Sequence, residues 1–134
     1  MKIHHVGYLV KKINKSINAF EALGYKKESE ICYDEYRDID ICFMKNDEYR
    51  IELVMPKSEK SVVHKMLKKI GISPYHLCYE VEDIEESIKY FTTKKGYILM
   101  DEKCKAPAID NKYVVFLFNK DIGMIELLER KERA

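Results

Sequence analysis

Two histidines and two glutamates stand at equivalent positions of two similar segments in this 134-residue sequence. The first segment begins at His5 and has Glu52 near its end, and the second begins at His76 and has Glu126 near its end. The repeat pairs His5 with His76, Tyr8 with Tyr79, Val10 with Val81, Ile13 with Ile84, Ile17 with Ile88, Phe20 with Phe91, and Ile51-Glu52-Leu53 with Ile125-Glu126-Leu127. Imidazole nitrogens and carboxylate oxygens are common ligands of divalent first-row metals. The duplicated histidine and glutamate therefore make a metal site the first hypothesis.

Strand alternation predicts on which face these four side chains lie. Successive side chains of a strand point to opposite faces of the sheet, so His5 and Leu9 lie opposite Val6 and Tyr8. The same alternation turns Glu52, His76 and Glu126 away from the helix of their own half. We predict that the same face also carries Leu9, Cys42, Met44, Val54, Val115, Leu117, Met124 and Leu128. An ionised glutamate in such apolar surroundings is costly unless it is paired or bound to a cation, which favours an N2O2 site for a divalent ion.

Each of the four residues taken singly is more often structural, and only their joint recurrence favours a metal site. His4 has the wrong strand parity and His64 falls on a polar helix face, so neither is predicted to be a ligand. Arg50 has three possible roles: it pairs with Glu52, it pairs with Glu80, or it holds an anionic group of a substrate.

Hydrophobic periodicity and turn residues predict two βαβββ units in tandem. The first has strands near 2–10, 27–34, 38–45 and 49–55 and a helix capped by Asn14 and closed by Gly24. The second has a strand at 75–81, a helix over 83–94 that begins with a capping box at Asp83, and strands near 97–103, 113–118 and 124–129. A separate helix over 58–70 connects the two units. The residues from Arg130 to the end are charged and expected to fray.

These elements predict an α+β fold. One helix covers only one face of each four-stranded sheet, so the other faces must curl around something or meet each other. We expect mixed sheets that form a cupped, barrel-like site. The whole chain, 1–134, is expected to be a single domain, with unit one at about 2–56, the connector helix at about 58–71 and unit two at about 74–129.

The amino-acid composition limits the classes of binding partner that we expect. The net charge is +1, with 46% apolar and 35% charged residues, which gives no reason to expect nucleic acid or a membrane as partner. The four cysteines include no C-x-x-C pair and no signal peptide is apparent, so we expect reduced thiols and a cytoplasmic location. Open sheet edges and a short chain favour a homodimer.

Three stretches together resemble the vicinal oxygen chelate superfamily. They are the His5-Val6-Gly7 opening, the Ile-Glu-Leu end of each half, and the restart Tyr75-His76-Leu77-Cys78-Tyr79-Glu80-Val81. The superfamily includes glyoxalase I, methylmalonyl-CoA epimerase, extradiol dioxygenases, and the fosfomycin and bleomycin resistance proteins. The resemblance extends from Ile3 to Glu129 and implies a glyoxalase-like fold. It also implies that the metal ligands are His5, Glu52, His76 and Glu126.

The ligand set discriminates among the members. A fourth ligand at Glu52 argues against extradiol dioxygenases, which use two histidines and one carboxylate, and bleomycin-binding members generally lack the quartet. Glyoxalase I resembles this chain in having glutamate at the second ligand position, in the 106–112 loop and in the 122–129 ending. Methylmalonyl-CoA epimerase often has glutamine at that position, but it resembles this chain in the connector 61–69. Many glyoxalase I enzymes hold a glutathione carboxylate with an arginine where this chain has Leu9, so the thiol is bound differently or is not glutathione.

The resemblance implies a metal-dependent lyase or isomerase that acts on a small molecule. It would move a proton, through an enediolate, on a carbon next to a metal-bound carbonyl or hydroxyl. The main expectation is glyoxalase I-type conversion of a 2-oxoaldehyde hemithioacetal to a 2-hydroxyacyl thioester, with nickel, zinc or cobalt as the metal and a thiol such as glutathione as cosubstrate. Glu126 would be the principal base and Glu52 its counterpart. Methylmalonyl-CoA epimerase is the alternative enzyme, and a metal-free small-molecule-binding or antibiotic-resistance module is the alternative from another class.

Overall fold

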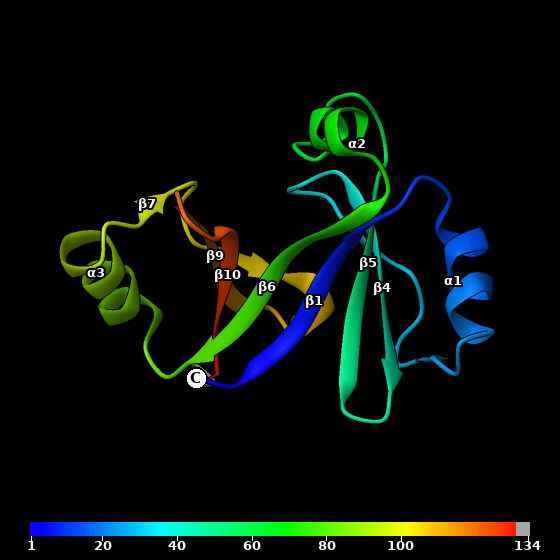
Figure 1. The fold of residues 1–134 in the computed structure, drawn as a ribbon, viewed down its shortest axis with the longest axis horizontal. Helices are drawn as coiled ribbons and strands as arrows, with labels where there is room; N and C mark the ends of the chain where they lie inside the picture. The colour runs from blue at the N-terminus through cyan, green and yellow to red at the C-terminus, as the bar shows by residue number, and fades with distance from the viewer. Residues whose placement is uncertain (131–134) are drawn as a thin grey trace. The chain divides into compact units, whose positions relative to one another are not determined.

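A computed structural model describes residues 1–130 of the chain, which divide into two compact units. One unit contains His5–Tyr75, and the other contains Met1–His4 together with the residues from His76 onward. Both units combine helices with a mixed sheet, so the predicted α+β class is confirmed (Figure 1). The single-domain assignment stays a prediction. The predicted fraying of the C-terminal tail concerns mainly residues 131–134, which lie outside the described residues.

The first unit is built on a long hairpin. Strands β4 (Ile39–Asn46) and β5 (Tyr49–Pro56) pair antiparallel, and β5 pairs in parallel with β1 (Ile3–Leu9). Two short strands, β2 (Lys26–Lys27) and β3 (Cys32–Asp34), pair with the outer edge of β4. Helix α1 (Ile13–Glu21) covers one face of this sheet.

The core of the first unit lies between α1 and the sheet. Ile13 and Ile17 of the helix pack against Val10, which follows β1, and against the sheet residues Cys42, Met44, Ile51 and Leu53. These side chains are nearly inaccessible to water, and burying each large apolar side chain contributes about 1.5–3 kcal/mol. The burial fixes which side of each strand faces the helix.

The second unit repeats this plan. Strand β6 (Ser73–Val81) pairs in parallel with β10 (Gly123–Glu129), which pairs antiparallel with β9 (Lys112–Asn119). The short strands β7 (Ile98–Leu99) and β8 (Cys104–Ala106) pair with β9, and a 3-10 turn, η1 (Pro107–Ile109), follows β8. Helix α3 (Ile84–Lys94) places Ile84 in a core with Val81, Val115, Leu117, Ile125 and Leu127.

Helix starts differ in part from the sequence expectation. Asp83 does cap α3, because its carboxylate accepts a hydrogen bond from the backbone N–H of Glu86. Asn14 does not cap α1. The helix begins two residues earlier than a cap at Asn14 would place it: its first residue is Ile13 and its N-cap residue is Lys12, which makes no side-chain capping bond.

The connector helix, α2 (His64–Ile70), begins six residues later than predicted. Side-chain hydrogen bonds hold the preceding residues in turns: the Ser58 hydroxyl donates to Asp38 at 2.5 Å and the Ser61 hydroxyl donates to the Arg37 carbonyl at 3.1 Å. Serine hydroxyls that bond elsewhere in this way compete with helix formation. None of the helices within residues 1–130 is long and apolar enough to cross a membrane.

We expect the hydrogen bonds that Asp38 accepts from Ser58 and Tyr33 to make the stability of the protein depend on pH in the acidic range. Hydrogen bonds from Ser58 and then Tyr33 lower the pKa of the Asp38 carboxyl. A lowered pKa in the folded state gives stability that is present above the unfolded pKa and is lost as the pH falls through the folded one. Asp38→Asn, which tolerates the left-handed backbone (φ 54°), should lower the melting temperature at neutral pH.

The measurement is a series of thermal melts from about pH 7 to about pH 3. The wild type and Asp38→Asn should converge as the pH falls. A difference in melting temperature that persists at the lowest pH would contradict the assignment.

Candidate metal centre

The first histidine–glutamate pair lies inside the unit His5–Tyr75. Strand β1 carries His5 and the adjacent strand β5 carries Glu52, whose register partner in β1 is Gly7. The Nε2 atom of His5 lies 3.4 Å from a carboxylate oxygen of Glu52. The two residues are 1% and 6% exposed, so this ligand pair is withdrawn from water.

The second pair has the same construction in the other unit. Strand β6 carries His76, and β10 carries Glu126, whose register partner in β6 is Cys78. The Nε2 atom of His76 lies 3.2 Å from a carboxylate oxygen of Glu126, and both residues are 4% exposed. A histidine thus lies beside a glutamate in each unit, at the positions that the repeat makes equivalent.

A phenylalanine lies against each histidine. Phe43 is the cross-strand partner of Glu52, and its ring meets the His5 imidazole edge to face at a centroid distance of 5.2 Å. Phe116 is the partner of Glu126 and meets His76 in the same way at 5.1 Å. Edge-to-face packing of this kind fixes ring orientation and keeps water away. Sequence reasoning missed both rings, although they too occupy equivalent positions in the repeat.

Four residues predicted on the same face as the histidines lie on the opposite one. Cys42, Met44, Val115 and Leu117 belong to the helix-covered cores, so their predicted placement was wrong. The reason is the register: Cys42 pairs with Leu53, which faces α1, whereas Phe43 pairs with Glu52. Burial raises the pKa of the Cys42 thiol, which keeps it a neutral core residue rather than a ligand.

Arg50 pairs with Glu28. Its guanidinium forms a bidentate ion pair with the Glu28 carboxylate, with donor–acceptor distances of 2.7 and 3.1 Å. Glu28 was not among the partners that the sequence suggested for Arg50. His64 begins α2, and Leu9, at the position that distinguishes this chain from many glyoxalase I enzymes, is fully buried.

Each pair has the chemistry of a metal-binding half-site. A buried carboxylate needs a counter-charge or hydrogen-bond donors, and an imidazole that points to the same place adds a nitrogen ligand. One nitrogen and one oxygen per unit suit borderline ions such as zinc, nickel or cobalt. The donor set therefore fits a divalent metal.

Comparison with known proteins gives a family and a fold. A family model described as the Glyoxalase/Bleomycin resistance protein/Dioxygenase superfamily matches residues 4–116. The mitochondrial methylmalonyl-CoA epimerase of Dictyostelium discoideum is 29% identical over 97% of this chain and 78% of its own length.

Solved structures show the same fold. A hypothetical protein from Bacillus halodurans C-125 superposes with a TM-score of 0.85 at 27% identity, covering 99% of this chain and 96% of its own. Methylmalonyl-CoA epimerase from Mycobacterium tuberculosis gives 0.84 at 24% identity, over 97% and 88%. These likenesses confirm the fold that the sequence predicts.

Proposed function

Because the chain belongs to the glyoxalase/bleomycin resistance protein/dioxygenase superfamily, we propose that it is a metal-dependent epimerase of an acyl-CoA thioester, with methylmalonyl-CoA as its substrate. The similarity to the Dictyostelium discoideum epimerase across nearly the whole chain carries this proposal. It reverses the order of the two enzymatic expectations, since the comparisons favour the epimerase over a glyoxalase I-type lyase. Nothing in them supports glutathione as a cosubstrate.

In this proposal His5, Glu52, His76 and Glu126 hold one divalent ion. The observation in favour is that each unit contributes the same buried imidazole–carboxylate pair. When bound, such an ion supplies positive charge that stabilises an enolate as the α-proton leaves. Nickel, zinc and cobalt all suit the donor set, and metal availability decides among them as much as affinity does.

The proposed roles of the glutamates follow from their equivalence. Glu126 removes the proton from the carbon between the thioester and the carboxylate of the substrate. Glu52, which must carry a proton at that moment, gives it to the opposite face, which inverts the configuration and changes no other bond. Exchange with solvent then returns both glutamates to their starting protonation states. Carboxylates act as general bases when they lie within hydrogen-bond reach of the proton, and burial strengthens their charge interactions. The adjacent imidazole fixes where each carboxylate points.

Glyoxalase I-type chemistry is the second candidate. The observation that favours it is the carboxylate of Glu52 beside His5, because glutamate at this ligand position is the feature that resembles glyoxalase I. The two reactions share proton removal next to a carbonyl, and they differ in where the proton is returned.

The deciding experiment is a turnover assay of untagged, metal-analysed protein with each of the three ions. Substrates are methylmalonyl-CoA, the methylglyoxal–glutathione hemithioacetal, and the same adduct of another cellular thiol. In deuterated water we expect deuterium at the α-carbon of methylmalonyl-CoA and no thioester from either hemithioacetal. Formation of a thioester from a hemithioacetal, with no deuterium entering methylmalonyl-CoA, would establish glyoxalase I-type activity instead. Absence of bound metal and of any response to added ions would favour the metal-free binding module.

The homodimer expected from the sequence belongs to this proposal. Light scattering during gel filtration tests it directly, and a monomer at micromolar concentration would contradict it.

A further inference from the structure

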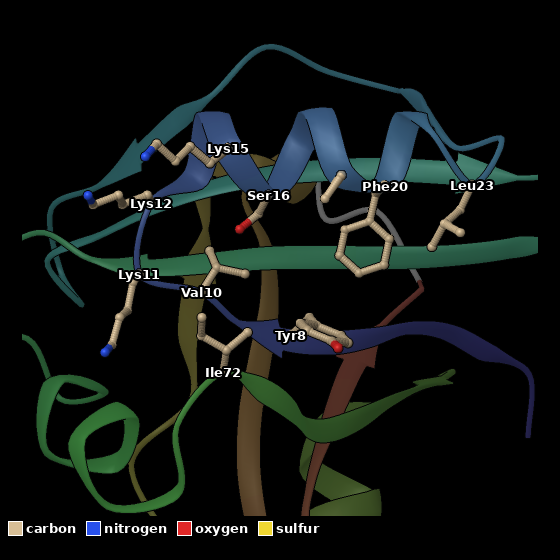
Figure 2. A pocket seen from close by; sticks show the side chains of 10 residues that line it. Tyr8, Val10, Lys11, Lys12, Lys15, Ser16, Phe20, Leu23 and Ile72 are labelled. Atoms are coloured by element: carbon tan, nitrogen blue, oxygen red, sulfur yellow. The ribbon is translucent and has the colours of Figure 1, made fainter.

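A groove lies within the unit His5–Tyr75, between helix α1 and the end of strand β1. Its volume is about 520 Å³, within the range of small-molecule sites. Tyr8 and Val10 form one wall with Ile72, and Ser16, Phe20 and Leu23 project from α1 and its C-terminal end toward them (Figure 2). Because Tyr8 and Val10 have the opposite strand parity to His5, the groove opens on the other face of the sheet from the His5–Glu52 pair.

One end of the groove is apolar and exposed. The rings of Tyr8 and Phe20 meet edge to face at a centroid distance of 5.2 Å. Leu23, beside Phe20, is 68% exposed, and Ile72, which lies beside Val10 on the side toward Lys11, is 55% exposed (Figure 2). Large apolar side chains gathered around a groove in this way indicate a surface that binds something apolar.

The other end is cationic. Lys11, Lys12 and Lys15 gather there next to Ser16, as Figure 2 shows. None of the three lysines forms an ion pair with a carboxylate of residues 1–130. The first turn of α1 contains no acidic residue either, so the positive end of its dipole adds to the lysine charges. In a chain with 24 basic and 23 acidic residues, such a cluster without counter-charges is complementary to an anion.

We propose that this groove binds a small anionic amphiphile, a single acyl or alkyl chain with a carboxylate or phosphate head group. The chain would lie on Tyr8, Phe20 and Leu23, and the head group would be held by Lys11, Lys12, Lys15 and the Ser16 hydroxyl. The site does not depend on the metal or on the epimerase activity, since it lies on the other face of the sheet from His5.

Titration calorimetry with decanoate and with decyl phosphate tests this binding. Both should bind one molecule per chain, and affinity should fall as salt is raised, because the head-group contacts are exposed charges. Decanol, which has the chain without the charge, and inorganic phosphate, which has the charge without the chain, should each bind at least tenfold more weakly. A preference between the two amphiphiles identifies the head group. Equal binding of decanol would overturn the proposal.

Variants locate the site. Reversing the charges in Lys12→Glu/Lys15→Glu should weaken binding of the amphiphiles roughly tenfold, because attraction becomes repulsion. Leu23→Asp should also weaken binding of the amphiphiles, because it removes an apolar contact with their alkyl chain. Lys120→Glu, an equal charge change per residue in the other unit, should leave binding unchanged. All these positions are exposed, and circular dichroism checks that the variants fold.

Two results would refute the assignment. One is wild-type affinity for the amphiphiles in both groove variants. The other is a dimer that binds no amphiphile and that dissociates when Ile72 is replaced by Asp. In that case a second copy of the chain would cover the groove. Metal content and turnover are measured on the same samples, so failure of the epimerase proposal is recognised separately.

Discussion

Glu126→Gln is expected to lower the turnover of methylmalonyl-CoA by about 100- to 10,000-fold, the usual contribution of a positioned general base. Glutamine keeps an oxygen at the same position but cannot accept the α-proton. Because that oxygen remains available as a ligand, we expect the variant to retain bound metal. The measurement is loss of the α-proton to deuterated water, followed by NMR, with metal content determined on the same samples.

The control for this variant is Glu48→Gln. Glu48 lies exposed in the turn between β4 and β5, so the same chemical change should leave turnover unaltered. Full turnover of Glu126→Gln with metal bound would remove Glu126 from the mechanism. Glu52→Gln then distinguishes a two-base reaction, in which it also slows exchange, from a reaction in which Glu52 only binds the metal.

Removing either paired histidine is expected to abolish metal binding at working concentrations. Outer-shell partners of metal ligands are typically worth about 10- to 100-fold in affinity, and a direct ligand is worth at least that much. His5→Ala and His76→Ala should therefore each lose at least about 100-fold in affinity for zinc, nickel or cobalt, and turnover should fall in parallel.

His64→Ala is the matched control, because His64 lies at the start of α2, outside both pairs. Calorimetric titration of metal into untagged, chelator-treated protein measures the affinities. If His5→Ala and His76→Ala each lost half of two bound ions, the two pairs would be separate sites. Wild-type affinity in both variants would exclude the pairs as ligands altogether.

The repeat was the part of the fold and site that the sequence predicted best. Equivalent histidines and glutamates in two similar segments identified the four residues, and strand parity turned all four away from the helix of their own half. The structure shows His5 beside Glu52 and His76 beside Glu126. Alternation was readable there because polar residues interrupt apolar ones, as in Ile51-Glu52-Leu53.

The face of the central strands could not be predicted in the same way. Ile41-Cys42-Phe43-Met44 is apolar throughout and fully buried, so no alternation marks which side faces the helix. Only the pairing register with β5 decides it. For this reason Phe43 and Phe116 were missed and Cys42 was misplaced. The late start of α2 was hidden for a different reason, since it depends on hydrogen bonds to Asp38 and Arg37, which are distant in sequence.

The tight β4–β5 turn has a consequence for how this protein tolerates changes in length. Asn46 pairs with Tyr49, so only Asp47 and Glu48 form the turn, with Asp47 in the left-handed region. Inserting one residue here would shift the pairing by one and exchange inward and outward side chains along one strand. Cys42 or Met44 would then replace the aromatic ring of Phe43 opposite Glu52. The length of this surface turn, which contains no ligand, therefore constrains the chemistry as strictly as the identity of the ligands does.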